Sequence, residues 1–376
     1  MIYLDNAATT PLDNEVYETM CSVMKNHYGN PSSVHAAGRN SRVLIEDSRS
    51  LIAGLLDVKP SELFFTSCAT EAITTAIHGV VKSLGIRKII TTAVEHHAVI
   101  HAVEDVLKSI PARVSFVRID KDANLDVQQL EELLEEEKEK TLVVIMHANN
   151  ETGSIFPVER ISKLCKEYHA VFMSDMVQSM GKYENKLSQH GPDITCCSAH
   201  KFHGPKGIGF LYLNENIRIA PLISGGGQER NMRSGTENIY GIAGMAKAFE
   251  VAYRDMEKNR EHITNLKSYF VEQLKQYFPE LVFNASCDTK GLYNIINVSV
   301  PDVYNNKLLL QKLDMEHIAV SGGSACSSGV VSVSHVLKAL NANADIPALR
   351  FSLSKYNSVE ELDKTIGVLK KILLKK

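Results

Sequence analysis

Residues 194–213 read ITCCSAHKFHGPKGIGFLYL, and this stretch carries the clearest fold signal in the chain. Two apolar runs, at 194–198 and 207–213, have the length and composition of buried β-strands. The loop between them contains a hydroxyl, two histidines and two lysines beside glycines. Polar residues gathered at the end of a buried strand are typical of a binding site. The stretch therefore predicts a sheet that carries a site at its edge.

Short β-rich runs alternate with helical periodicity on both sides of this stretch. Five more strands are predicted, at 63–66, 88–92, 113–119, 142–147 and 171–175. Helices predicted at 70–83, 126–140 and 158–168 are long enough to connect parallel strands. We therefore expect an α/β fold with a mostly parallel seven-stranded sheet. The acidic run at 131–140 keeps leucines at helical spacing, which predicts a solvated helix face rather than a partner site.

The predicted domain boundary follows the glycine run at 225–227, where a helical stretch extends from 237 to about 278. A large domain is expected over residues 15–255. Residues 1–14 and 256–376 are expected to form a smaller α+β domain. The smaller domain is predicted to hold a strand at 292–300, a helix near 305–316, a mobile loop at about 321–333 and a last helix from 358.

Composition excludes several classes of protein. The 376 residues carry 41 basic and 44 acidic side chains without a basic block, which argues against direct binding of nucleic acid. No apolar run is long enough to span a membrane, and the N-terminus MIYLDNAATT lacks the pattern of a signal peptide, so we expect a cytoplasmic protein. Seven cysteines without a CxxC pair predict neither a disulfide framework nor a metal site.

The polar loop suits pyridoxal 5'-phosphate, because this aldehyde cofactor needs a lysine for an imine. Lys201 is the candidate and Lys206 is its competitor. The cofactor also needs a carboxylate on its pyridine nitrogen, and Asp175 ends the strand at 171–175, although a lone Asp there can also cap a helix. The segment TSCATEAITTAI, 66–77, predicts a helix opening near Thr70, whose free N–H groups could bind the phosphate.

Cys326 lies in SGGSACSSG, 321–329, where small residues allow the backbone to sample many conformations. A structural cysteine is more often surrounded by packing residues. A nucleophile that must enter a site and leave with its cargo benefits from such mobility. The loop therefore predicts a catalytic thiol, and the alternative is a nonessential loop thiol.

The chain as a whole resembles the cysteine desulfurases, fold-type I pyridoxal-phosphate enzymes related to the class-V aminotransferases, in the NifS/IscS-like branch with a long mobile loop. The resemblance covers essentially the whole chain. It rests on ten segments: YLDNAATT (3–10), PSSVHAAGR (31–39), TSCATEA (66–72), EHHAV (95–99), MHANNETG (146–153), SDMVQSMGK (174–182), SAHKFHGPKG (198–207), GGGQERNMRSGTEN (225–238), SGGSACSSG (321–329) and LRFSLS (349–354).

The resemblance implies a role for each matching residue. Lys201 would bind the cofactor aldehyde, Asp175 would pair with the pyridine nitrogen, and Gln178 would bond the phenolic oxygen. His96 would stack on the ring and mediate proton transfer. The remaining implied ligands are Ala69, Thr70, Ser198, His200 and, from the second subunit of a homodimer, Thr236 for the phosphate; Asn149 for the cofactor and substrate; and Arg350 for the substrate carboxylate.

The implied activity is removal of sulfur from L-cysteine, giving L-alanine and a persulfide on Cys326. The sulfur would then pass to a protein acceptor, either a tRNA-thiolating enzyme or an iron–sulfur scaffold. Cys68 stands where the family usually has glycine, and we expect a small buried filler there rather than a second reactive thiol.

Two other classes of function fit the same residues. One is a selenocysteine lyase or another fold-type I aminotransferase. The other is a noncatalytic sulfur carrier or scaffold. The cysteine in its Gly/Ser loop argues against an aminotransferase, and the full set of cofactor groups argues against a binding module.

Overall fold

The computed structural model describes residues 1–136, 139–305, 307–322, 334–340 and 346–374. Its central sheet has seven strands in the order β2-β8-β7-β6-β5-β3-β4. All neighbouring pairs are parallel except the two that involve β8. The prediction of a mostly parallel seven-stranded sheet is thus confirmed. The strands are β2 (Leu63–Thr66), β3 (Lys88–Thr92), β4 (Arg113–Val117), β5 (Thr141–Val144), β6 (Val171–Asp175), β7 (Ile194–Ser198) and β8 (Gly209–Leu213).

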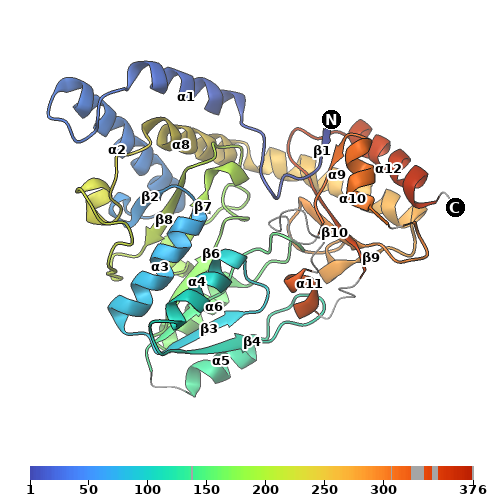
Figure 1. The fold of residues 1–376 in the computed structure, drawn as a ribbon, viewed down its shortest axis with the longest axis horizontal. Coiled ribbons are helices and arrows are strands. Elements are labelled where there is room, and N and C mark those ends of the chain that lie inside the picture. The colour runs from blue at the N-terminus through green and yellow to red at the C-terminus, as the bar shows by residue number, and fades with distance from the viewer. Residues whose placement is uncertain (137–138, 306, 323–333, 341–345, 375–376) are drawn as a thin grey trace.

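Helices cover both faces of this sheet (Figure 1). On one face, α3 (Ala69–Leu84) and α4 (His97–Leu107) pack against the side chains of Phe64, Leu211 and Cys196. The other face is covered by α1 (Asn14–Asn26), α2 (Ala36–Leu56), α8 (Ile239–Arg254), α5 (Val127–Glu135) and α6 (Val158–Glu167). Cys196 and Cys197 alternate between the two faces, and both are fully buried, as expected for small apolar fillers.

A second, smaller set of elements lies beside the large sheet (Figure 1). β12 (Ala348–Ser352), β10 (Ile295–Ser299) and β9 (Val282–Phe283) form an antiparallel sheet, and β1 (Ile2–Tyr3) pairs with β11 (Ile318–Ala319) in parallel. Their core contains the rings of Phe270, Phe278 and Phe351. The helices around this core are α9 (Met256–Tyr277), α10 (Leu309–Met315) and α12 (Val359–Leu373).

Several shorter helices lie between the longer helices and the strands. α11 (His335–Ala339) belongs by sequence to the second set, yet Val336 packs into the core that α5 and α6 form on the large sheet. The other short helices are α7 (Leu187–His190) and 3₁₀ turns at Pro60–Glu62, Ala199–Lys201, Gln228–Asn231 and Asn284–Ser286.

Several predicted helices have different bounds in the structure, among them the one expected near 305–316, which is Leu309–Met315. The stretch predicted from 237 to 278 is two helices, because the backbone leaves the helical conformation at Asp255 between α8 and α9. The helix predicted to reach 140 ends at Glu135. Its Leu130 and Leu134 are buried, which confirms a solvated acidic face. α3 begins at Ala69, one residue earlier than expected.

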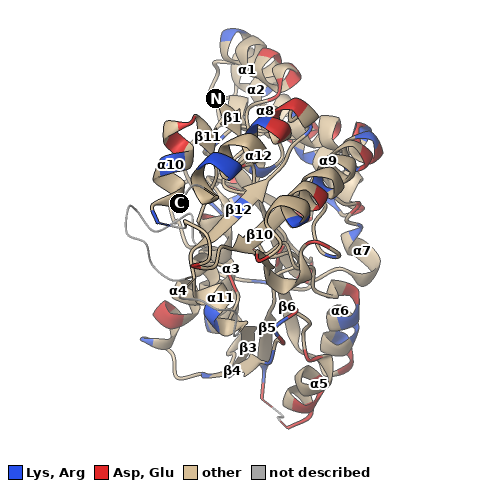
Figure 2. Ribbon diagram, turned by 90° about the vertical axis from the view of Figure 1, so that its right-hand side faces the viewer, with Lys and Arg blue, Asp and Glu red and all other residues tan. Residues whose placement is uncertain are grey.

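Acidic and basic residues alternate along the ribbon in Figure 2, and acidic residues are grouped on α5. Among the helices described, none has the length and apolar character needed to cross a membrane.

Gly209 on β8 is a position where a side chain cannot fit. An added Cβ would lie 2.3 Å from the carbonyl oxygen of Cys197 on the neighbouring strand, so the backbone would have to move. We expect Gly209→Ala to lower the free energy of unfolding by about 2 kcal/mol or more. Urea unfolding, followed by circular dichroism, measures this change.

Gly54 in α2 is the matched control, because an added Cβ there meets no atom within 4 Å. Gly54→Ala should raise stability by about 0.5–1 kcal/mol, since alanine loses less conformational freedom in a helix. Equal unfolding midpoints for the two variants would contradict this description of the β7–β8 contact.

Candidate active site

A cavity of about 290 Å³ lies at the carboxyl ends of the parallel strands. Its wall comes from the ends of β6 and β7, the turns before α3 and α4, the N-terminal segment and β12. The residues predicted for the site that line this cavity are Ala69, Thr70, His96, Asp175, Gln178, Ser198, His200, Lys201 and Arg350. Segments far apart in the sequence therefore meet at one place.

Lys201 reaches this cavity from the 3₁₀ turn after β7. Its Nζ donates hydrogen bonds of 2.8 Å to the carbonyl oxygens of Ala7 and Ala8. Lys206, the competing candidate, is exposed and is not among the residues lining the cavity. The structure therefore favours Lys201 as the amine that meets a ligand.

Asp175 is the last residue of β6, and Gln178 lies in the turn that follows it. Asp175 is buried, and its Oδ1 accepts a 2.9 Å bond from the N–H of Val177, so it does stabilise the local turn as a cap would. Gln178 donates from Nε2 to the carbonyl oxygen of Ala7 at 3.0 Å. Its buried Oε1 has no partner among the described residues. A polar group inside the cavity would satisfy that oxygen.

The N-terminus of α3 forms one end of the cavity. The N–H of Ala69 donates to Ser198 Oγ at 2.9 Å, and the N-cap residue Cys68 makes no side-chain cap bond. N–H groups at such a helix start are suited to a phosphate. Burial and then the charge of Lys201 lower the pKa of His200 to about 4, so its ring is neutral at pH 7.

Cys68 is not the buried filler that we expected. It is half-buried and lines the cavity, because the N-cap position of α3 lies in the cavity wall.

His96 has its ring fixed by a backbone contact. It is the N-cap of α4, and its Nδ1 accepts a 3.1 Å bond from the N–H of Ala98. Burial lowers the pKa of His96, although the charge of Asp175 opposes this effect. Because Nδ1 is an acceptor, the proton of the neutral ring sits on Nε2, which can then donate.

Arg350 is fully buried on β12 and is held at two points. Its two terminal nitrogens donate to the carbonyl oxygen of Asn150 at 2.8 Å and to Asp5 Oδ1 at 2.9 Å. Its Nε has no partner among the described residues. The guanidinium is thus oriented in advance, and the N–H of Nε is among the donors left for a ligand.

Two predicted ligands lie elsewhere in this chain. Asn149 bonds the backbone instead of facing the cavity: Nδ2 donates to the carbonyl oxygen of Val94, and Oδ1 accepts from the N–H groups of Glu151 and Thr152. Asn150 lines the cavity in its place. Thr236 lines a different, smaller cavity beside the end of β2, and Cys326 lies outside the described residues.

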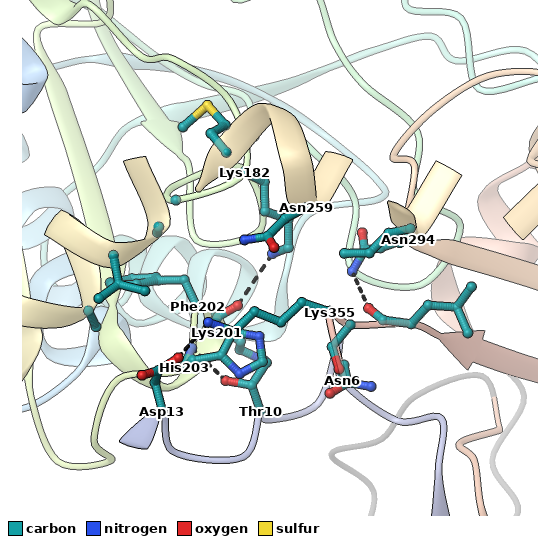
Figure 3. A pocket seen from close by; sticks show the side chains of 18 of the residues that line it. Asn6, Thr10, Asp13, Lys182, Lys201, Phe202, His203, Asn259, Asn294 and Lys355 are labelled. Atoms are coloured by element: carbon teal, nitrogen blue, oxygen red, sulfur yellow. Dashed lines mark hydrogen bonds and ion pairs between the residues drawn. The ribbon is translucent and has the colours of Figure 1, made fainter. Parts of the chain in front are cut away.

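A second cavity lies on the other side of Lys201, between α8, α9 and residues 353–355, which follow β12 (Figure 3). There Lys182 donates from Nζ to the carbonyl oxygens of Gln178 at 2.9 Å and Lys201 at 3.4 Å. Burial, and next the charge of Lys201, lowers the pKa of Lys182 to about 7. The amide oxygens of Asn6 and Asn294 have no partner among the described residues, which suits ordered water. Lys182 therefore links the backbone of Gln178 to the backbone of Lys201, two residues of the site.

Sequence reasoning missed two buried carboxyls. Burial raises the pKa of Glu95 to about 8, and burial raises the pKa of Glu151 to about 7. Glu95 Oε1 accepts from Thr92 and from the N–H of Met146, while Glu151 accepts a 2.6 Å bond from Ser334. Glu95 lies in the segment EHHAV and Glu151 in the segment MHANNETG, but no pattern of neighbouring residues shows that these glutamates are buried.

These residues fit pyridoxal phosphate. The cavity offers an amine on Lys201, a buried carboxylate on Asp175, the unpartnered Gln178 Oε1 and a helix start without a side-chain cap. A group with an aldehyde, a ring nitrogen and a phosphate finds a partner for each of these parts.

Known proteins with similar sequences and folds lead to the same cofactor. Residues 2–365 match the family described as Aminotransferase class-V. Cysteine desulfurase IscS of Dictyoglomus turgidum is 42% identical, and the match covers all of this chain and 95% of the relative. A putative cysteine desulfurase of Bacillus subtilis, IscS 1, is 37% identical, and the match covers 96% of this chain and 95% of the relative. A solved NifS-like protein is 36% identical, covers 99% of this chain and 98% of its own, and superposes with a TM-score of 0.90. The apo structure of a cysteine desulfurase from Thermococcus onnurineus is 26% identical, covers 99% of this chain and 94% of its own, and superposes with a TM-score of 0.88.

The buried Glu95 predicts a pH dependence of stability. Burial raises its pKa from the ordinary 4.5 to about 8, so the folded protein keeps a proton that the unfolded chain releases. Stability should therefore fall as the pH rises from about 4.5 to about 8. Glu95→Gln cannot ionise and should reduce this slope by up to about 1.4 kcal/mol per pH unit.

The slope is measured by urea unfolding of the cofactor-free protein at several pH values between about 5 and about 8, the range in which Glu95 titrates. Glu132→Gln, an exposed position on α5, is the control and should leave the slope unchanged. The same slope for Glu95→Gln and wild type would show that Glu95 is ionised in the folded protein.

Proposed function

We propose roles for individual residues on the premise that this chain belongs to the class-V aminotransferase family and, within it, to the cysteine desulfurases. It is a pyridoxal-phosphate enzyme that takes sulfur from L-cysteine and leaves L-alanine. The observation that carries the assignment of roles is the single cavity at the carboxyl edge of the sheet, which gathers nine of the predicted residues.

Lys201 and Asp175 are proposed to hold the cofactor. The bound cofactor supplies an electron sink for negative charge at the substrate α carbon. Lys201 would hold the aldehyde through its amine, and the same amine, when free, would remove the proton from the substrate α carbon. The carbonyl oxygens of Ala7 and Ala8 lie within 2.8 Å of Nζ and can accept hydrogen bonds from the protonated amine that results. Asp175 keeps a proton on the pyridine nitrogen.

Arg350 and His96 are proposed to act on the substrate. Arg350 is already oriented by Asp5 and Asn150, and its free Nε can bind the substrate carboxylate. His96 holds its proton on Nε2, because Ala98 occupies Nδ1, so it acts first as a proton donor. Asn149 supports this edge of the site through the backbone that it bonds.

Cys326 is proposed as the sulfur acceptor, on the basis of its loop sequence. Its thiolate attacks the substrate sulfur, an S–S bond forms and the C–S bond breaks. The electron pair of the broken bond stays with the substrate carbons, which take up protons and leave as alanine. The reaction converts one thiol and one cysteine into one persulfide and one alanine, so it needs no external oxidant.

A homodimer is proposed for the assembled enzyme. Apolar side chains are exposed on α1, α2 and α8, of which α8 packs on both α1 and α2. Others are exposed in the segment between α1 and α2 and in the loop before residue 225. A second copy covering this face would bury them and bring Thr236 to the partner's cofactor phosphate. The exposed apolar residues are Tyr17, Met24, Tyr28, Val34, Val43, Leu222, Ile223 and Tyr240.

The persulfide sulfur is proposed to pass to a protein acceptor, either a tRNA-thiolating enzyme or an iron–sulfur scaffold. Relatives that bear the name IscS support a sulfur-delivery role of this kind.

Lys201→Ala should abolish the visible absorbance of the bound cofactor together with turnover, because Lys201 is the only lysine among the described residues that lines the cavity. Lys206→Ala is the matched control and should keep both, since Lys206 is exposed. Absorbance spectra of the three reconstituted proteins measure this. Loss of the absorbance in Lys206→Ala alone would move the imine to that residue.

Cys326→Ser should bind the cofactor and the substrate but transfer no sulfur. The measurement is alanine production from L-cysteine, with a reductant present, by wild type and variant. Alanine and sulfide from the wild type alone are expected. Alanine from both proteins at one rate would exclude Cys326 as acceptor, and a keto acid product would point to an aminotransferase.

A further inference from the structure

Thr236 lies near the end of an anchored loop, residues 225–238, shortly before α8 begins at Ile239. Its side chain is exposed, whereas Ser234 and Glu237 on either side are buried. Ser234 donates to the carbonyl oxygen of Gly226 at 2.7 Å, and Glu237 pairs with Arg42 of α2 at 3.0 Å. The loop therefore holds one hydroxyl residue outward at a defined place.

A buried ion pair anchors the base of this loop. Arg49 on α2 donates two bonds of 2.8 Å to the carboxylate of Glu229, and both side chains are almost completely buried. Glu229 also accepts a 2.8 Å bond from the N–H of Phe65 on β2. Glu229, Arg230 and Asn231 all have positive φ values, a conformation that these contacts must maintain.

A third ion pair connects the loop to the cofactor end of α3. Arg233 donates from Nε to Glu71 at 2.9 Å, and Glu71 accepts a 2.9 Å bond from the N–H of Ser67. Burial acts against the charge of Glu71, but the bonds from Arg233 and Ser67 outweigh it and lower the pKa of Glu71. Glu71 lies two residues after Ala69. The N–H of Ala69 donates to Ser198 Oγ, and both residues line the cavity.

The turn that opens α3 and the loop that presents Thr236 are therefore one connected unit. We propose that Arg233 is a positioning residue that links the phosphate-binding turn of its own subunit to the Thr236 loop serving the partner subunit, so that the two cofactor sites of the dimer are coupled. This inference rests on the homodimer of the proposed function.

The coupling has a direct physical basis. A phosphate bound at the start of α3 restricts the turn at Ser67–Glu71, and Arg233 transmits that restriction to the loop. A loop already ordered loses less conformational entropy when Thr236 contacts the partner's phosphate. The effect is reciprocal, because the free energy of coupling between two binding events is the same in both directions.

Mixed dimers separate effects within a subunit from effects on its partner. In the first dimer, one subunit carries Arg233→Met with Lys201→Ala, and the other is wild type. Lys201→Ala removes the visible cofactor signal of its own subunit, so the absorbance reports only the partner's site. The measured quantity is the rate at which that absorbance decays after free cofactor is removed.

Three further dimers complete the comparison. The reference carries Lys201→Ala alone in one subunit, and the matched control adds Arg118→Met, which removes an exposed arginine paired with Asp126. The third carries Thr236→Val in place of Arg233→Met. We expect Arg233→Met and Thr236→Val each to speed cofactor loss from the partner about fivefold, and the control to leave the rate unchanged.

Arg233→Lys keeps the cation and should restore part of the slow rate. Unchanged cofactor loss from the partner in a stable Arg233→Met dimer would overturn the positioning role of Arg233, and with it the coupling, while leaving the dimer and the activity in place. A single subunit mass in native mass spectrometry would instead overturn the proposed homodimer, and this inference with it.

Discussion

Parallel pairing of β6 with β7 is the constraint on which the site depends. The register sets Asp175 opposite Cys196, so the two strands end at the same edge of the sheet. Asp175 and Gln178 leave this edge from one strand, and Ser198, His200 and Lys201 leave it from the next. β2 has the same direction, because its neighbour β8 is antiparallel to both β2 and β7, and it brings the start of α3 to the same place. The strand directions therefore determine where the chemistry can occur.

The N-terminal segment joins this edge to the smaller set of strands. Leu4 and Asn6 bond the backbone of β11 and β12, and Thr10 bonds the carbonyl oxygen of His200. Between these anchors the carbonyl oxygens of Ala7 and Ala8 face Lys201. A short segment that precedes every strand of the large sheet thus forms one wall of the cavity, and Arg350 on β12 forms part of another.

Buried charge gives the site its chemical character. The site brings together Asp175, Glu95, Lys182, Lys201 and Arg350, and burying such groups costs free energy unless they are paired or lose their charge. Arg350 is paired with Asp5, whereas the raised pKa of Glu95 and the lowered pKa of Lys182 show that burial favours their neutral forms. Burial thus reduces the charge on Glu95 and Lys182, whereas Arg350 keeps its charge beside Asp5 and lines the cavity together with Lys201 and Asp175.

Local patterns in the sequence determined the strands and the chemistry. β2, β3, β6 and β7 have the predicted bounds, because runs of buried apolar residues between polar turns identify strands directly. The motifs also pointed to Lys201 over Lys206 and to the turn before α3. Only the tertiary structure decided that Asn149 bonds the backbone, that Cys68 lines the cavity, that Glu95 is buried and that Arg233 pairs with Glu71. These depend on contacts between segments distant in the chain, and no local pattern of residues records which distant backbone will supply a partner.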